Sequence, residues 1–212
     1  ANTARSGCVT AQVSTELSEK WRAKIGGKLS SPVAASGRLF VSVIDAHQIH
    51  ALDMASGAPL WRFTAGGRID SPPTIWNNRV LFGSADGYVY SLRADDGQLI
   101  WRYRAAPADL RMGAFEQIES VWPVHGSVLI HNGQVWFAAG RSPFLDDGIR
   151  VCAADPASGQ VVFETQVFSR GQQKFHAARP ASTPGACLRS TCCTTPLTRL
   201  RGPFCSRPGR VT

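Results

Sequence analysis

What the sequence lacks limits the classes of protein that it can encode. No apolar run reaches the roughly 20 residues that a membrane-spanning helix needs. The phosphate-binding, dinucleotide-binding, metalloprotease and serine-hydrolase signatures are absent, as are Asn-x-Ser/Thr glycosylation acceptors and CxxC pairs. No signal peptide is recognisable, and this carries no weight about location. Catalysis therefore has no support from motifs, and we identify no catalytic residue and no metal ligand.

Acidic residues are missing from the end of the chain. All 15 Asp and Glu residues lie at or before Glu164, whereas 8 of the 23 Lys and Arg residues follow it. The part up to Glu164 is therefore neutral, and the net charge of +8 belongs to the end. A basic patch on a folded face would indicate nucleic acid, but a basic chain end does not. We expect no nucleic-acid partner.

Residues 169–212 also lack the alternation of apolar and polar residues that is typical of strands. They hold five prolines and four of the six cysteines, namely Cys187, Cys192, Cys193 and Cys205. A segment of this composition cannot bury a core. We expect this basic, Cys- and Pro-rich tail to be disordered or to result from translation out of frame, and a zinc-binding end is the remaining alternative.

What the sequence does contain is a repeated phrase at a fixed spacing. ALDMASGAPLW at 51–61 returns as SLRADDGQLIW at 91–101, and AADPASGQVVF at 153–163 is a third, degenerate copy. Trp21 precedes Trp61 by the same interval that separates Trp61 from Trp101. Self-similarity at a fixed period of about 20–50 residues indicates a repeat architecture, in which each repeat is one structural unit.

Each period contains the pattern of four short strands. In the first period we expect them at 32–36, 38–44, 47–52 and 60–64, where β-branched and aromatic residues lie between Gly, Asp, Ser and Pro. Four strands in roughly 40–45 residues are typical of a propeller blade, a four-stranded antiparallel sheet packed radially around a channel. The sequence therefore predicts an all-β fold of the β-propeller class.

The repeated phrase has a physical role in such a blade. A hairpin turn between the third and fourth strands needs a residue at positive φ, which Gly57 and Gly97 adopt without steric cost. Asp53 can accept backbone N–H bonds at the first of these turns. Trp61 and Trp101 then offer broad apolar surfaces, which we expect to be largely buried between neighbouring blades.

The pattern Ala-x-Asp-x-x-Ser/Thr-Gly-x-x-x-Trp resembles the tryptophan-docking motif of the pyrroloquinoline-quinone (PQQ) enzyme repeat. That repeat occurs in quinoprotein alcohol dehydrogenases and in non-catalytic, BamB-like propellers. The matching residues are Ala51, Asp53, Ser56, Gly57 and Trp61 in the first copy, Gly97 and Trp101 in the second, and Ala153, Asp155, Ser158, Gly159 and Phe163 in the third. Because the motif is structural throughout the family, the resemblance implies the fold and no particular activity.

The repeats give the expected domain organisation. Residues 1–19 form an N-terminal extension, and residues 20–168 hold the PQQ-like repeats, with one closing strand around Trp21. The blades are expected at about 30–65, 70–105 and 121–167. A closed propeller has roughly 4–8 blades. We therefore expect an incomplete propeller, whose open strand edges make the isolated chain self-associate.

Two insertions lengthen the third repeat. Residues 106–120 extend the connection before it, and residues 141–149 extend an internal loop. The spacing of Leu110, Phe115 and Ile118 predicts a short amphipathic helix in the first insertion. Insertions in repeat proteins often form the binding face. The candidate binding residues around them are Glu116, Glu119, Trp122, His125, Arg141, Asp146 and Asp147.

Other residues that suggest a metal or cofactor have simpler explanations. His47 and His50 are three apart on an expected strand, so they point to opposite faces. Asp86–Gly87 and Asp95–Gly97 lack the downstream Glu of a calcium loop and are ordinary turn signals. The resemblance to PQQ dehydrogenases implies a vicinal cysteine pair against the cofactor, but Cys192–Cys193 lie in the tail. The segment itself supports no cofactor.

We favour a non-catalytic binding or scaffolding module, because the docking motifs are intact while no active-site set is recognisable. Its partner would be another protein or the remaining propeller blades. One alternative is a fragment of an alcohol or sugar dehydrogenase that uses PQQ and Ca²⁺. Another is the sensor ectodomain of a larger membrane protein. The resemblance implies an extracytoplasmic location, periplasmic or secreted.

Overall fold

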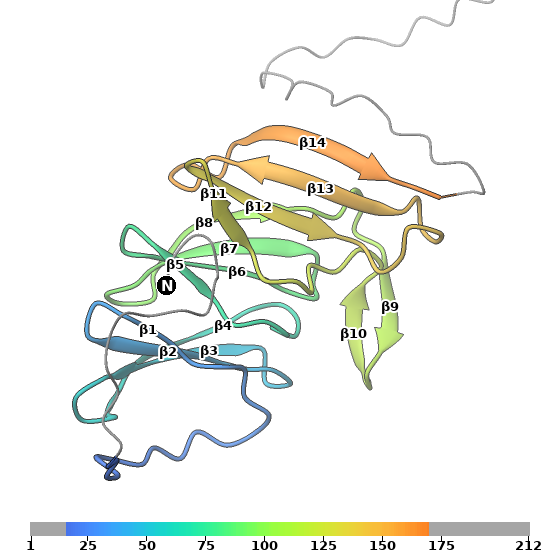
Figure 1. Cartoon of the computed structure of the whole chain (residues 1–212). Helices are drawn as coiled ribbons and strands as arrows, with labels where there is room; N and C mark the ends of the chain where they lie inside the picture. Colours follow the sequence, from blue (N-terminus) through green and yellow to red (C-terminus); the bar gives the residue numbers. More distant parts are fainter. Residues whose placement is uncertain (1–15, 170–212) are drawn as a thin grey trace, which may run out of the picture. The chain divides into compact units, whose positions relative to one another are not determined.

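The computed structural model describes residues 16–169. They form three four-stranded antiparallel sheets, one for each repeat, and one separate hairpin (Figure 1). The strands are β1 (Val33–Ala35), β2 (Arg38–Val43), β3 (Gln48–Asp53), β4 (Pro59–Thr64), β5 (Thr74–Trp76), β6 (Arg79–Gly83), β7 (Tyr88–Arg93), β8 (Leu99–Arg104), β9 (Arg111–Ala114), β10 (Gln117–Ser120), β11 (Leu129–His131), β12 (Gln134–Ala139), β13 (Ile149–Ala154) and β14 (Val161–Val167). The predicted all-β fold with four-stranded antiparallel blades is confirmed. No helix of the described residues is long and apolar enough to span a membrane.

The three sheets share the details of their strand pairing. In the first, Ala51 of β3 lies opposite Trp61 of β4, and the pairing shifts directly after Ala51. The same shift follows Ser91 in the second sheet and Ala153 in the third. Such irregularities change the local twist and re-aim the side chains beyond them. The repeat of the sequence is therefore a repeat of structure as well.

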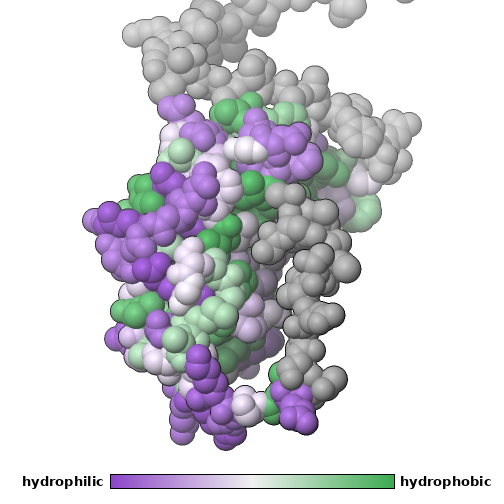
Figure 2. Space-filling model, turned by 60° about the vertical axis from the view of Figure 1, so that its left-hand side comes forward, coloured by the Kyte–Doolittle hydropathy of each residue, from purple (hydrophilic) through white to green (hydrophobic). Residues whose placement is uncertain are grey.

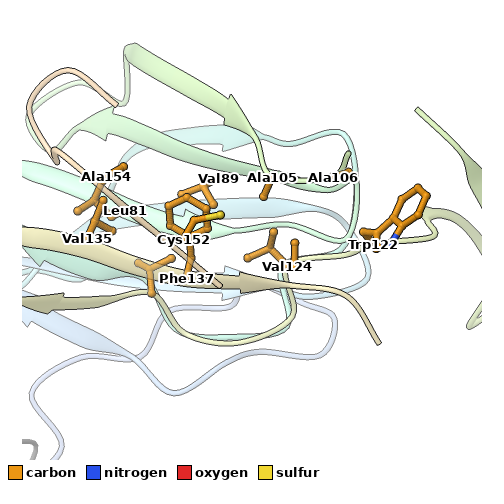
Figure 3. Packing of buried hydrophobic residues seen from close by; sticks show 12 residues of the cluster. Leu81, Val89, Ala105, Ala106, Trp122, Val124, Val135, Phe137, Cys152 and Ala154 are labelled. Atoms are coloured by element: carbon orange, nitrogen blue, oxygen red, sulfur yellow. The ribbon is translucent and has the colours of Figure 1, made fainter. Parts of the chain in front are cut away.

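The middle blade is buried on both faces. Val80 and Phe82 of β6 belong to a hydrophobic cluster with Phe40 of the first blade. Leu81, between them, belongs to a second cluster with Val135 of the third blade (Figure 3). Successive side chains of a strand point to opposite faces of the sheet, so β6 contributes alternately to the two clusters. This packing places the three blades side by side in chain order.

The outermost strand of each blade is buried less completely. In β4 and β8, exposed residues alternate with half-buried ones, among them Trp61 and Trp101. Figure 2, which brings the left-hand side of Figure 1 forward, shows hydrophilic and hydrophobic residues interspersed on that face. Trp61 and Trp101 are partly buried and pack against the two hydrophobic clusters, in line with the expectation that they lie between neighbouring blades. The exposed residues beside them face solvent, because the last strand of a blade has a free edge.

The strand order gives each blade two ends. Because neighbouring strands are antiparallel, the β3–β4 type of turn lies at one end, and the β2–β3 type of turn lies at the other with the connections between blades (Figure 1). The first end, which we call the docking end, includes turns 54–58, 94–98 and 155–160. The second, which we call the connector end, includes segments 44–47, 65–73, 84–87, 105–128 and 140–148.

The prediction of a helix in the first insertion is wrong. β9 and β10 form an antiparallel hairpin, and its two turn residues, Phe115 and Glu116, have φ angles of 51° and 62°. Two residues at positive φ are typical of the tight turn that suits twisted strands. The three apolar positions that suggested a helix fall before the hairpin, at its turn and on β10. So few positions cannot distinguish a helix from two short strands.

The segment around Trp21, expected as a closing strand, forms no strand. Its strand-type pairing with a sheet is one isolated bridge between Leu29 and Val43. A closing strand pairs with the third strand of its own blade, and no strand precedes this segment within the described residues. The predictions for the tail, including those for Cys192–Cys193, concern residues beyond 169, which lie outside the described part of the chain.

Candidate functional site

At the docking end, each docking tryptophan lies against the turn of the following blade. A Cβ atom added to Gly97 would lie 2.5 Å from Cε3 of Trp61. Nε1–H of the same indole donates a hydrogen bond to the carbonyl of Ala94 at 3.0 Å. Gly97 has a φ angle of 73°, which glycine adopts without strain. Glycine is thus required for two reasons: the turn needs a positive φ angle, and the indole leaves no space for a Cβ atom.

The same contact occurs twice more. Trp21 covers Gly57, and Trp101 covers Gly159. Their indole N–H groups donate to the backbone carbonyl three residues before the covered glycine, at 3.1 and 3.0 Å. Trp21 makes this contact although its segment forms no strand. The docking contact therefore depends on the indole and the turn rather than on complete strand pairing.

Acidic side chains close two of these turns. Asp53 accepts hydrogen bonds from the hydroxyl and the backbone N–H of Ser56, at 2.7 and 2.8 Å. Asp155 does the same with Ser158, at 2.6 and 3.0 Å. The hydrogen bonds from these serines hold the pKa of both carboxyl groups below the ordinary value. Both aspartates stabilise the turn in their ionised form.

Two copies depart from the motif without losing the turn. In the second, Arg93 stands where the first copy has Asp53, and it forms an ion pair with Asp96 at 2.7 Å. In the third, Phe163 replaces the tryptophan and packs against Trp136 of its own blade, with ring centroids 5.4 Å apart. The docking end is a structural device in which side chains vary around a constant turn.

At the connector end, Arg68 is the centre of a cluster of ion pairs. Its side chain is 8% exposed and lies 2.6 Å from Asp70, 3.2 Å from Asp45 and 3.5 Å from Glu119. These acids come from three segments, because Asp45 is in the β2–β3 turn, Asp70 in the connection between the first two blades and Glu119 in β10. A guanidinium has several N–H donors in one plane and can join several carboxylates. Arg68 therefore holds three parts of the chain together.

Glu119 is the most buried member of this cluster. Its side chain has no exposed surface, and its Oε2 accepts a hydrogen bond from Nη2 of Arg141 at 2.6 Å. Arg141 also donates to the carbonyl of Ser120 at 3.4 Å. A buried charge is tolerated when such partners compensate its loss of solvation. Glu119 thus ties the β9–β10 hairpin to Arg68 on one side and to the β12–β13 loop on the other.

His125 extends the cluster beyond Asp70. Its Nδ1 lies 2.5 Å from Oδ2 of Asp70, while Nη2 of Arg68 donates to Oδ1 of Asp70. Burial acts to raise the pKa of Asp70, but the hydrogen bond with His125 and the positive charge of Arg68 outweigh it and hold that pKa below the ordinary value. Asp70 is therefore an ionised acceptor between two donors.

The β9–β10 hairpin closes over the cluster. The ring of Phe115 lies over the guanidinium of Arg68, with its centroid 4.3 Å from Cζ, a cation–π contact. The side chain of Gln117 accepts a hydrogen bond from Nε2 of His47 at 2.6 Å and donates one to the carbonyl of Asp45 at 3.1 Å. The hairpin follows the second blade in sequence, yet its tip is fixed to a turn of the first.

Three of the seven candidate binding residues, Glu119, His125 and Arg141, belong to this cluster. Trp122 is buried at one end of the core between the second and third blades (Figure 3), and its indole N–H donates to the carbonyl of Asp146 at 2.5 Å. Glu116, Asp146 and Asp147 are exposed, at the hairpin tip and in the β12–β13 loop. The structure thus joins the two insertions at their bases.

Arg68, Asp70 and Asp45 were not among the predicted site residues. A signal for Asp70 was present in the repeat itself, because the preceding repeat has the uncharged Ser30 one period earlier in the chain. A charge that the repeat counterpart lacks indicates a function particular to that position. Arg68 carried no such signal, because its counterpart Lys28 is also a cation, and the role of Asp45 depends on a contact with Arg68 that only the fold creates.

The described residues do not fit a calcium site. Within residues 16–169, no group of three or more His, Cys, Asp or Glu side chains could hold a metal ion. Ca²⁺ takes about 6–8 oxygen ligands, and the carboxylates gathered at the connector end are already bound by arginines. No reaction step through PQQ or Ca²⁺ can be built on these side chains.

Four-stranded sheets joined by indole-on-glycine docking define the class of PQQ-repeat β-propellers. The family described as Outer membrane protein assembly factor BamB matches residues 7–190. The chain belongs to this BamB-like family of PQQ-repeat proteins. The match extends beyond the range of 20–168 that the repeat indicated, in both directions.

The individual relatives include an assembly factor and a dehydrogenase subunit. The outer membrane protein assembly factor BamB of Burkholderia pseudomallei (strain K96243) is 36% identical over 96 residues, which cover 44% of this chain and 25% of that protein. The dehydrogenase subunit of a quinone alcohol dehydrogenase from Gluconacetobacter polyoxogenes is 25% identical over 146 residues, covering 64% and 19%. The chain thus spans at most a quarter of the length of these two relatives.

Solved structures show the same fold. The quinohemoprotein alcohol dehydrogenase from Comamonas testosteroni matches with a TM-score of 0.55 and 19% identity, over 66% of this chain and 21% of that one. A computationally designed protein, Ika4, matches with a TM-score of 0.52 and 13% identity, over 76% of this chain and 98% of that one. At these identities the likeness concerns the fold alone.

Proposed function

We propose that this segment belongs to a non-catalytic propeller that binds partner proteins through its connector end. The observation that carries the proposal is the buried carboxylate of Glu119 between Arg68 and Arg141. It fixes the bases of both insertions on the blades. Binding residues are often found on loops that a rigid scaffold positions, and fixing a loop before binding reduces the entropy that binding costs.

Similarity to BamB supports a role in outer-membrane protein assembly. The Burkholderia relative named for that role is 36% identical to this chain in the matched part, compared with 25% for the quinone alcohol dehydrogenase subunit. A protein in this role acts outside the cytoplasm, and its partners are proteins. The ion pairs at the connector end also favour a binding role over a catalytic one. The carboxylates of this cluster are paired with arginines and are therefore not free to bind a metal ion.

The second candidate is a segment of a quinone-dependent dehydrogenase. It is favoured by the longer match of 146 residues to the alcohol dehydrogenase subunit. In that case blades beyond this segment would supply the cofactor site, including an aspartate base, the calcium ligands and a vicinal disulfide. The described residues contribute no group to it.

Two experiments on the full-length protein separate these candidates. Removing the protein from its host should lower the amount of folded outer-membrane proteins, as expected for an assembly factor. Purified protein mixed with PQQ and Ca²⁺ should not reduce an electron-accepting dye with ethanol or glucose. Saturable dye reduction that depends on PQQ, together with normal outer-membrane proteins in the deletion strain, would overturn the proposal.

A further inference from the structure

The two insertions expose apolar side chains at the connector end. On and beside the hairpin these are Leu110, Met112, Phe115 and Ile118, which together we call the hairpin surface. At the tip of the β12–β13 loop, Phe144 and Leu145 are exposed as well. Phe115 and Ile118 are each 67% exposed, which is unusual for large apolar residues in a well-anchored segment. Ile118 lies opposite Gly113, whereas Met112 lies opposite Glu119 and therefore on the other face of the hairpin. Ile118 is thus the exposed apolar side chain beside Gly113, and a large apolar residue this exposed indicates an interaction site.

The hairpin surface is held in place rather than free to fold back onto the core. Glu119 anchors the base of β10 to Arg68 and Arg141. Gln117 anchors the other end of β10 to the β2–β3 turn of the first blade. Both anchored side chains lie on the same strand as Ile118, which points away from them because successive side chains alternate. The exposed apolar residues are therefore presented by a fixed framework.

One edge of the hairpin has free backbone groups. The hairpin is a separate two-stranded sheet. On the β10 side, N–H of Ser120 donates to the carbonyl of Ala85 at 2.8 Å, so this edge is partly occupied. On the β9 side, no backbone hydrogen bond of the described residues reaches the outward groups of Arg111 and Gly113. An unpaired edge is a template for another strand.

Gly113 makes this edge accessible. It lies opposite Ile118 in the hairpin, and a Cβ atom added to it would meet nothing within 4 Å. The open space next to Ile118 can take an apolar side chain of an incoming strand. Gly113 does not have a positive φ angle, so neither turn geometry nor close packing in this chain accounts for a glycine there.

The surroundings of the hairpin surface are acidic. Glu116 at the hairpin tip and Asp146 and Asp147 in the β12–β13 loop are exposed, and none has an ion-pair partner among the described residues. The one exposed cation of β9, Arg111, is paired with Asp109 at 3.1 Å. Charge complementarity therefore favours a basic partner.

We infer that the outer edge of β9 binds an extended segment of a partner protein in which apolar residues alternate with Lys or Arg. The segment adds as a third strand beside Arg111 and Gly113, places an apolar side chain next to Ile118 and brings its cations near Glu116. This inference rests on the proposed binding function and specifies the surface that performs it.

The test uses the full-length protein and a fluorescent synthetic peptide of alternating Leu and Lys residues. Fluorescence anisotropy should show saturable binding, and Ile118→Lys should raise the Kd at least about tenfold. The matched control is Ile100→Lys, which changes an exposed isoleucine at the start of β8, at the docking end of its blade, and leaves the Kd unchanged. A peptide of alternating Leu and Glu should not bind. Adding the basic peptide should also slow the amide exchange of Gly113.

Several results would overturn the inference. These are no binding of the basic peptide, equal binding of the acidic peptide, equal loss of binding in both isoleucine variants, or binding with no change at the amide of Gly113. Preferred binding to phospholipid vesicles over the peptide would assign the surface to a membrane and overturn it as well. If Ile118→Lys leaves outer-membrane protein assembly normal while the deletion strain is defective, the surface is wrong and the proposed function stands.

Discussion

The docking end and the connector end of the blades are built differently, although the same strands run between them. At the docking end, three indoles cover three glycine turns with nearly the same geometry, and their N–H groups donate at 3.0–3.1 Å. At the connector end, backbone hydrogen bonds recur between blades, but the cluster of ion pairs occurs once. One arginine, Arg68, joins acids from three segments, and a hairpin found in one connection closes over it.

The difference separates contacts that stabilise the repeated fold from contacts that are particular to this protein. A contact that recurs in every blade serves the packing of blades, and its loss should be felt along the repeat. A cluster that occurs once serves the segment in which it occurs. We therefore expect changes at the docking end to lower global stability, and changes at the connector end to release the hairpin as well.

The largest effect is expected at Glu119. Glu119→Gln keeps the size of the side chain but leaves Arg68 and Arg141 without their shared buried carboxylate, which should cost about 3–5 kcal/mol in the free energy of unfolding. Urea unfolding of the full chain measures it. Glu116→Gln, at the exposed hairpin tip, is the matched control and should change stability by less than about 0.5 kcal/mol. Equal effects of both variants would contradict a buried ionic anchor.

The next largest effect is expected at Trp61. Trp61→Ala removes the half-buried indole from Gly97 and should cost about 3 kcal/mol. Trp61→Phe keeps an aromatic ring but loses the hydrogen bond to Ala94, for which we expect about 1 kcal/mol. Thermal and urea unfolding report both values. A phenylalanine variant as unstable as the alanine variant would show that ring packing is not the main contribution.

A smaller effect is expected from a pair of glycine variants that separates the cost of the turn conformation from the cost of the docking contact. Gly97 and Gly133 have φ angles of 73° and 74°, but only Gly97 has an indole against it, whereas a Cβ atom on Gly133 would meet nothing within 4 Å. Gly133→Ala should therefore cost about 1–2 kcal/mol for the left-handed backbone alone. Gly97→Ala should cost about 1–3 kcal/mol more, because the new methyl group displaces Trp61. Equal losses of stability in the two variants would mean that the Trp61 indole moves away at no cost and would contradict the docking contact.

The smallest effect concerns pH. The pKa of Asp70 in the folded protein lies below its ordinary value of 3.8, so its contribution to stability is fully present above that pH and is lost as pH falls through the lowered pKa. The stability difference between the wild type and Asp70→Asn should thus shrink as pH falls below about 5. Unfolding curves at several acidic pH values measure it, and a difference that grows as pH falls through this acidic range would contradict the lowered pKa of Asp70.

The fold could be predicted from the sequence because it repeats. Gly57 and Gly97 lie one period apart, as do Trp61 and Trp101, and the alternation between them defined the strands. The hairpin was missed because Leu110, Phe115 and Ile118 are too few to fix a period. Its turn, Phe115–Glu116, also lacks the Asn-Gly or Asp-Gly signal that usually identifies a tight hairpin.

The candidate site could be predicted only in part. Glu119, His125 and Arg141 were identified because they lie near the insertions. Their partners Arg68 and Asp45 belong to other blades, and only folding brings them within 3.5 Å of the cluster. Sequence spacing cannot supply such contacts, which depend on the stacking of one blade on the next.

The central claim, that a single buried cluster holds the connector end independently of the docking end, is tested most directly by hydrogen exchange in Glu119→Gln. Amide exchange of the full chain would be compared with the wild type under native conditions. We predict that residues 111–120 lose clearly more protection than the docking turns 54–58 and 94–98, which lose at most what the lower global stability implies. An equal loss of protection at both ends, or no loss at either, would contradict the account.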